Sequence, residues 1–94
     1  MDDLDLFNRL ARIARPAHVD YAPITSMDTP FPETGLDSLD ALMISIYYSD
    51  IYGVPDEVAK EFTPTTPAEM VALMKQHKTK EPASIDEAVE AIQW

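Results

Sequence analysis

The apolar residues divide the chain into helical segments that are separated by prolines and polar stretches. In residues 4–14 the apolar positions recur at helical spacing and form one stripe. Acidic residues precede this stripe and arginines follow it, an order of charges that favours a helix dipole. We expect Pro16 to stop the helix, because Arg15, the residue before this proline, avoids helical geometry.

A second helix is predicted over residues 38–52, where the apolar positions cover almost the whole circumference. A helix of this kind is either buried or presents a face to a partner. Asp37 and Ser38 are residues that begin helices. Gly53 is a suitable left-handed residue to end this helix.

Two further helices are expected before residue 78. Residues 55–62 predict a short third helix, and Thr66 is a plausible N-cap for a fourth. Pro67 would occupy the first helical position and Glu69 would complete a capping box. The apolar spacing of this fourth helix fades near His77.

The last part of the chain predicts a short amphipathic helix after a linker. Ser84 and Glu87 form another capping-box pattern ahead of a single apolar stripe. A helix this short is marginal in water, so it folds back on the body, binds a partner or stays half formed. We therefore divide the chain into a helical bundle over residues 1–79 and an extension over residues 80–94.

Residues 17–34 contain three prolines and little periodicity, which predicts a long loop. Its apolar residues would pin it to the body: Tyr21, Ile24, Met27 and Phe31. No segment alternates in the manner of a strand bounded by hairpin turns. We expect an all-α protein, a small four-helix bundle with a long loop between helices 1 and 2 and a short third helix.

Composition narrows the classes of function. The chain has 94 residues, enough for one domain, with 17 acidic against 7 basic residues and a net charge of −10. This charge argues against nucleic acid and anionic membranes and favours basic protein partners. No apolar run is long enough to span a bilayer, and the acidic N-terminus lacks the basic start of a signal peptide. We expect a cytoplasmic monomer.

Independent enzymatic chemistry is not expected. The two histidines, His18 and His77, have no paired metal-ligand spacing, and the chain has no cysteine. No Gly-x-Ser-x-Gly elbow is present, and a serine at a helix start is not by itself an activated nucleophile. The sequence thus predicts neither a catalytic residue nor a metal site.

Residues 35–40, Gly-Leu-Asp-Ser-Leu-Asp, resemble the attachment motif of acyl carrier proteins, and residues 54–63 are similar to that family's third helix. The resemblance covers residues 4–77. It implies that Ser38 carries a covalent 4′-phosphopantetheine arm and that Asp37 helps to position the cofactor during transfer. Taken without the resemblance, Ser38 is an ordinary N-cap and Asp37 a favourable charge at a helix start.

The resemblance also implies a function. Acyl intermediates would be held as thioesters on the arm and delivered to fatty-acid, polyketide or related specialised enzymes. A phosphopantetheinyl transferase and acyl-loading and acyl-processing enzymes with basic docking patches would be the partners. Two alternatives stay open, an unmodified helical interaction module and a peptidyl or aminoacyl carrier. Asp37 and the strong negative charge favour the acyl type.

In the family, carboxylates along the second helix meet basic patches on partner enzymes. The implied partner-binding residues here are Leu39, Asp40, Met43, Tyr47 and Asp50. Met43 stands where an acid is common, so we expect a specialised pathway whose enzymes contact an apolar patch of Met43, Tyr47 and Tyr48. The alternative is that these side chains belong to the core, and it is the stronger one for Tyr48.

The family holds its acyl chain between the second and third helices. The resemblance therefore implies an acyl pocket lined by Leu42, Ile46, Val54, Ala59 and Phe62. The same residues are equally compatible with a plain bundle core.

Overall fold

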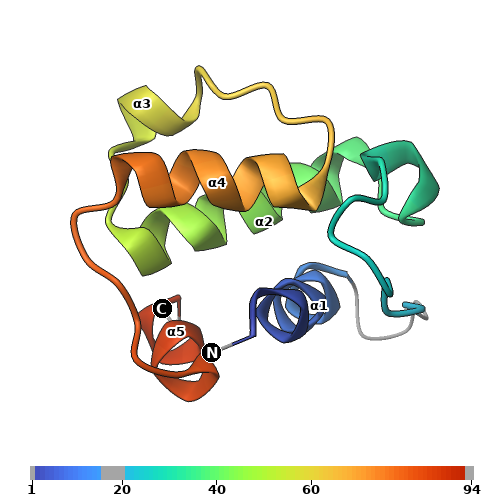
Figure 1. Ribbon diagram of the computed structural model, residues 1–94, viewed down its shortest axis with the longest axis horizontal. Coiled ribbons are helices and arrows are strands. Elements are labelled where there is room, and N and C mark those ends of the chain that lie inside the picture. Colours follow the sequence, from blue (N-terminus) through green and yellow to red (C-terminus); the bar gives the residue numbers. More distant parts are fainter. Residues whose placement is uncertain (1, 16–20, 93–94) are drawn as a thin grey trace.

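The computed structural model describes residues 2–15 and 21–92, and every regular element within them is a helix (Figure 1). In chain order these are α1 (Asp3–Ala14), the 3-10 turn η1 (Phe31–Glu33), α2 (Ser38–Tyr52), α3 (Asp56–Ala59), α4 (Pro67–His77) and α5 (Ile85–Ala91). The predicted all-α class is confirmed. None of the described helices combines the length and apolar character needed to cross a membrane.

The first helix follows the sequence prediction closely. The Asp2 carboxylate accepts a hydrogen bond from the Leu4 N–H at 2.9 Å and caps the start of α1. The helix ends at Ala14, and Arg15 turns to an extended conformation. Pro16, which we expected to stop the helix, lies outside the described residues.

The bounds of α2 are those that the sequence predicted, but its cap is Asp37 rather than Ser38. The Asp37 side chain and Asp40 form a capping box, so Ser38 becomes the first helical residue. Gly53 ends the helix in the left-handed region, with φ at +64°.

The next two helices differ from prediction in detail. The third helix was expected to reach Phe62, whereas α3 ends at Ala59 and is followed by tight turns. The Thr66 side chain caps α4 as expected. The Glu69 carboxylate, however, accepts from the N–H of Thr65 at 3.0 Å instead of the N–H of Thr66.

The core is built around α2, which contacts α1, α3, α4 and α5. Figure 1 shows α4 lying along α2, while α1 and α5 lie on another side of α2. This central position explains why α2 is apolar around most of its circumference. Fully buried residues from four helices meet in one cluster, among them Leu6, Phe7, Leu10, Ile44, Tyr48, Tyr52, Met74 and Ala88.

The C-terminal helix α5 belongs to the same core. Ala88 is fully buried, Ile92 is nearly so, and α5 packs against both α1 and α2. Of the three alternatives for the C-terminal helix, the structure shows the one in which the helix folds back on the body.

Residues 21–37, which precede α2, are fixed to the body by polar as well as apolar contacts. The side-chain amide oxygen of Asn8 accepts from the Tyr21 hydroxyl at 2.7 Å and from the Ile24 N–H at 2.9 Å. The Asn8 side-chain amide also donates to the Ile24 carbonyl at 3.1 Å. Further along, the Phe31 N–H donates to the Thr65 carbonyl, which joins this segment to the start of α4. These contacts hold residues 21–31 against α1 and the start of α4.

Candidate functional site

Ser38 is exposed at the first position of α2. Within the described part of the chain its hydroxyl has no hydrogen-bond partner, and the backbone N–H groups of Ser38 and Leu39 have none either. Such N–H groups lie at the positive end of the helix dipole and form a favourable place for an anion.

The local sequence explains why the serine is presented in this way. The Asp37 carboxylate accepts from the Asp40 N–H at 2.9 Å, and the Asp40 carboxylate accepts from the Asp37 N–H at 3.3 Å. Gly35 supplies the left-handed conformation, with φ at +82°, that turns the chain into the helix. Because Asp37 takes the capping role, the hydroxyl of Ser38 is left free for other chemistry.

Arg15 is a part of the site that the sequence analysis missed. Its guanidinium donates to the Gly35 carbonyl at 2.6 Å and lies 3.4 Å from the Asp40 carboxylate. The sequence predicts for Arg15 only a role at the end of the first helix, as a favourable charge and as the residue before Pro16. No local signal identifies the contact, because it joins residues that are far apart in the chain.

The predicted partner-binding residues do not share one environment. The exposed fraction of the residue is 64% for Leu39 but only 7% for Asp40 and for Tyr47. Met43 and Asp50 are half-buried. Asp40 thus differs from an exposed docking carboxylate, because the capping box and Arg15 hold it inside the fold.

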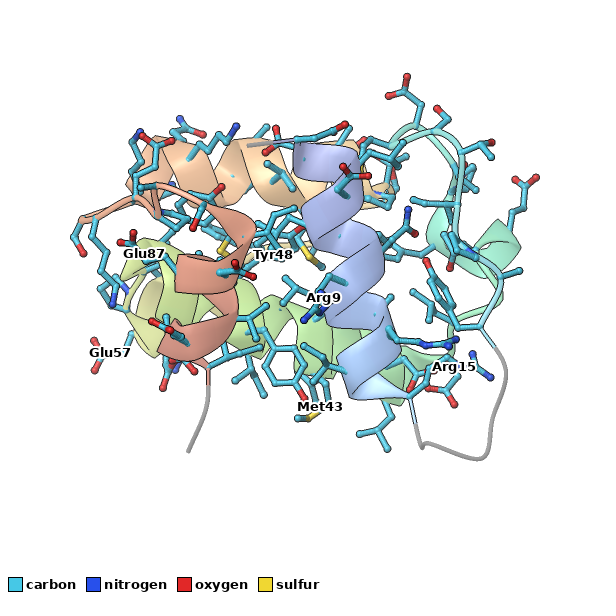
Figure 2. The ribbon with its side chains drawn as sticks, turned by 90° about the horizontal axis from the view of Figure 1, so that it is seen from below. Arg9, Arg15, Met43, Tyr48, Glu57 and Glu87 are labelled. Atoms are coloured by element: carbon cyan, nitrogen blue, oxygen red, sulfur yellow. The ribbon has the colours of Figure 1, made fainter. Side chains whose placement is uncertain are left out.

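Met43, Tyr47 and Tyr48 do not form the expected exposed apolar patch, because both tyrosines are buried. Tyr48 is fully buried, and Figure 2 shows it among the helices while Met43 lies near the edge of the molecule. The tyrosines are buried because α2 is covered by other helices on that side. The exposed large apolar residues of α2 are instead Leu39 and Leu42.

A cavity of about 640 Å³ opens beside Ser38, between α2, α3 and the segment that leads to α4. Its lining includes four of the five residues predicted for an acyl pocket, which are Leu42, Ile46, Ala59 and Phe62. The fifth, Val54, is buried in the core and does not line the cavity. Its N–H bonds back to the Ser49 carbonyl at the end of α2, which fixes it in the turn after Gly53.

The cavity also has polar residues that the prediction did not include. They are Ser38, Ser45, Ser49, Asp56, Lys60 and Thr63. The serines could have been found from the sequence, since positions 38, 45 and 49 fall on one face of a helix. The others lie on or after α3 and face the serines only through the tertiary fold.

His77 does not line the cavity but neighbours one of its walls. His77 is exposed, and its ring lies 5.3 Å from the ring of Phe62. His18 lies outside the described residues.

Comparisons of this chain with protein-family models, with curated proteins and with solved structures found no match. The functional argument therefore depends on the motif around Ser38 and on the geometry of the cavity beside it.

Proposed function

We propose that the chain is an acyl carrier protein and that Ser38 is the attachment site of a covalent 4′-phosphopantetheine arm. The observation that carries this proposal is the juxtaposition of a free, exposed serine hydroxyl with a mostly apolar cavity of about 640 Å³. A carrier needs both features, an accessible hydroxyl for attachment and a nearby apolar space for the attached chain.

The residues around Ser38 fit a phosphodiester. The unpaired N–H groups of Ser38 and Leu39 favour a negative charge there. The two carboxylates nearby are already engaged, Asp37 in the capping box and Asp40 with Arg15, which limits their repulsion of a phosphate.

The attachment step requires an external transferase and coenzyme A. The Ser38 hydroxyl oxygen forms a bond to phosphorus, the bond from that phosphorus to the nucleotide part of coenzyme A breaks, and the hydroxyl proton passes to the transferase. When bound, the arm supplies the thiol that holds an acyl group as a thioester. Asp37, next to the attachment point, supports the transfer by holding the helix start in place.

The chain's own contribution is to hold and deliver the acyl group. Tethering raises the effective concentration of the acyl group at a docked enzyme. Leu42, Ile46, Ala59 and Phe62 provide the apolar walls that shelter the acyl chain from water.

Partner enzymes dock on the exposed side of α2. Leu39 and Leu42 offer apolar contacts beside Ser38, with Met43 and Asp50 further along the helix. The net charge of −10 attracts enzymes with basic patches, the phosphopantetheinyl transferase included. The partners are acyl-loading and acyl-processing enzymes of a fatty-acid, polyketide or related specialised pathway.

In this proposal α1, α2, the short α3 and α4 make up a four-helix carrier bundle over residues 1–79. Residues 21–37, which precede α2, lead to Ser38 at the cavity. The extension over residues 80–94 adds α5, which packs on α1 and α2.

The test is co-expression of the full chain with a promiscuous phosphopantetheinyl transferase, followed by intact-mass measurement. We expect the wild type to gain one phosphopantetheine group and Ser38→Ala to gain none. Ser45→Ala is the matched control, because it removes another serine of the same helix and should still be modified. A wild type that stays unmodified while a known carrier is modified in parallel would overturn the proposal. That result would favour the alternative, an unmodified helical interaction module.

A further inference from the structure

The α2 wall of the cavity carries a row of hydroxyl groups. Ser38, Ser45 and Ser49 all line the cavity. At 100° per residue they lie within about 40° of one another around the helix axis. Ser45 is about 10 Å along the axis from Ser38, and Ser49 about 6 Å further. The row therefore starts at the proposed attachment point and runs along the α2 wall of the cavity.

The two inner serines differ in what their hydroxyls do. Ser49 is buried, and its hydroxyl donates to the Ser45 carbonyl at 3.0 Å, the usual back-bond of a serine inside a helix. Ser45 is half-buried, and its hydroxyl has no hydrogen-bond partner in the described residues. Ser45 is thus the member of the row that can donate to, or accept from, a bound molecule.

Polar side chains also stand on the other wall. Lys60 follows α3 and Thr63 lies in the next segment, and both line the cavity. The Lys60 ammonium forms no ion pair with any other described residue. The cavity therefore has hydrogen-bonding groups on the wall opposite α2 as well as on α2 itself.

A saturated chain would not use these groups. It would displace water from the half-buried Ser45 hydroxyl and offer no hydrogen bond in return, which is unfavourable. A chain with a hydroxyl or carbonyl oxygen would replace that water. Binding sites of this kind are mostly apolar, with a few placed polar groups that decide specificity.

We infer that the cavity selects acyl chains that carry oxygen beyond the thioester, such as 3-hydroxyacyl or 3-oxoacyl groups, and that Ser45 hydrogen-bonds this oxygen. The inference rests on the proposed carrier function and adds the substrate class to it. The pantetheine arm has amide and hydroxyl groups of similar chemistry, so the experiment must separate the arm from the acyl chain.

The experiment compares three forms of the full chain, each loaded by the transferase from the corresponding synthetic coenzyme A compound. They carry the arm alone, an octanoyl group or a 3-hydroxyoctanoyl group. Two readouts are used, the amide NMR shifts of Ser45 and Thr63 and the rate of spontaneous thioester hydrolysis. We expect the shifts to change most in the 3-hydroxyoctanoyl form. For each acyl group, the hydrolysis rate on the protein is divided by the rate of the free thioester. We expect this quotient to be about fivefold lower for the 3-hydroxyoctanoyl form than for the octanoyl form, which is the effect of one net hydrogen bond.

Substitution of Ser45 supplies the controls. Ser45→Ala should abolish the extra protection, and Ser45→Thr, which keeps a hydroxyl, should restore it. Equal protection of the two acyl forms, or a difference that persists in Ser45→Ala, would overturn the inference. The same shifts in the form with the arm alone would also overturn it, since the arm would then occupy Ser45. A chain that cannot be loaded at all fails earlier, by mass, and that result overturns the carrier function itself.

Discussion

Arg15 and Asp40 form an ion pair that joins the end of α1 to the start of α2. The guanidinium lies 3.4 Å from the carboxylate and also donates to the Gly35 carbonyl at 2.6 Å. One side chain thus holds both the turn before Ser38 and the capping box around it. The contact fixes the position of the proposed attachment site relative to the rest of the bundle.

Replacing Arg15 with alanine should lower the free energy of unfolding by about 2 kcal/mol, because a largely buried carboxylate and a carbonyl both lose a charged donor. Urea unfolding monitored by circular dichroism measures this loss. Arg9→Ala is the matched control, since Arg9 is an exposed arginine of the same helix and has no ion pair among the described residues (Figure 2). Equal losses in the two variants would contradict a specific role for Arg15.

The helices could be predicted from the sequence because their signals are local. The bounds of α2 follow from Asp37 and Gly53, which act within one turn of the helix ends. The same reasoning failed for α3, which ends at Ala59, because no capping residue marks its end. Local patterns were informative wherever a cap or a left-handed glycine made the helix boundary sharp.

The candidate site was only partly predictable. Leu42 and Ile46 could be placed at the cavity because they share a helical face near Ser38. The link from Arg15 to Asp40 could not, since the two residues are 25 positions apart in the chain and their contact depends on how two helices cross. The burial of Tyr47 and Tyr48 likewise follows from helices packed on α2, which no periodicity in α2 itself reveals.

Gly53→Ala should destabilise the protein by about 2 kcal/mol, more than Gly35→Ala, which should cost about 1 kcal/mol. Both glycines have positive φ, but a Cβ at Gly53 would collide with the Thr79 hydroxyl, whereas a Cβ at Gly35 meets nothing within 4 Å. Thr79 also bonds to the Tyr52 and Gly53 carbonyls and so closes the end of α2. Parallel thermal unfolding of the two variants makes the comparison, and similar losses would show that backbone strain alone is responsible.

Tyr48→Phe should raise the free energy of unfolding at pH 7 by about 1 kcal/mol, because a buried hydroxyl without a partner among the described residues is removed. Tyr21→Phe is the contrasting control. The Tyr21 hydroxyl donates to Asn8 at 2.7 Å, so its loss should be destabilising. Urea unfolding of both variants decides the matter, and a loss of stability in Tyr48→Phe would contradict the prediction.

Tyr48 should also make the protein sensitive to alkaline pH. Burial raises the pKa of Tyr48 well above its usual value of 10.0, and the charges of Tyr52 and Asp3 add to the effect. Above pH 10 the unfolded chain releases the phenolic proton of Tyr48, while the folded chain retains it. The contribution of Tyr48 to the free energy of unfolding should therefore be constant below pH 10 and fall by about 1.4 kcal/mol per pH unit above it. The decline should be shallower in Tyr48→Phe, and identical slopes in the two proteins would contradict this origin.

Ala88→Asp should unfold the protein or destabilise it by more than about 3 kcal/mol, since it places an unpaired charge in the core between α5, α1 and α2. Ala91→Asp is the control, because Ala91 is an exposed residue of the same helix. Thermal unfolding by circular dichroism compares the two. If both variants were as stable as the wild type, α5 would not be part of the folded core in solution.

The exposed leucine next to Ser38 provides a test of docking that is independent of folding. Leu39 is an exposed large apolar residue on α2, and an enzyme that reaches the Ser38 hydroxyl must pass close to it. Leu39→Asn should slow modification by the transferase roughly tenfold, the effect of losing about 1.4 kcal/mol of interface contact. The melting temperature should not change, because the side chain packs against little in the free protein.

Ile13→Asn is the matched control for Leu39→Asn. Ile13 is another exposed large apolar residue, but it lies on α1. Its replacement should leave the modification rate unchanged if the transferase docks on α2. Equal slowing of both variants would indicate a general loss of apolar surface, and no slowing in either would remove Leu39 from the docking surface.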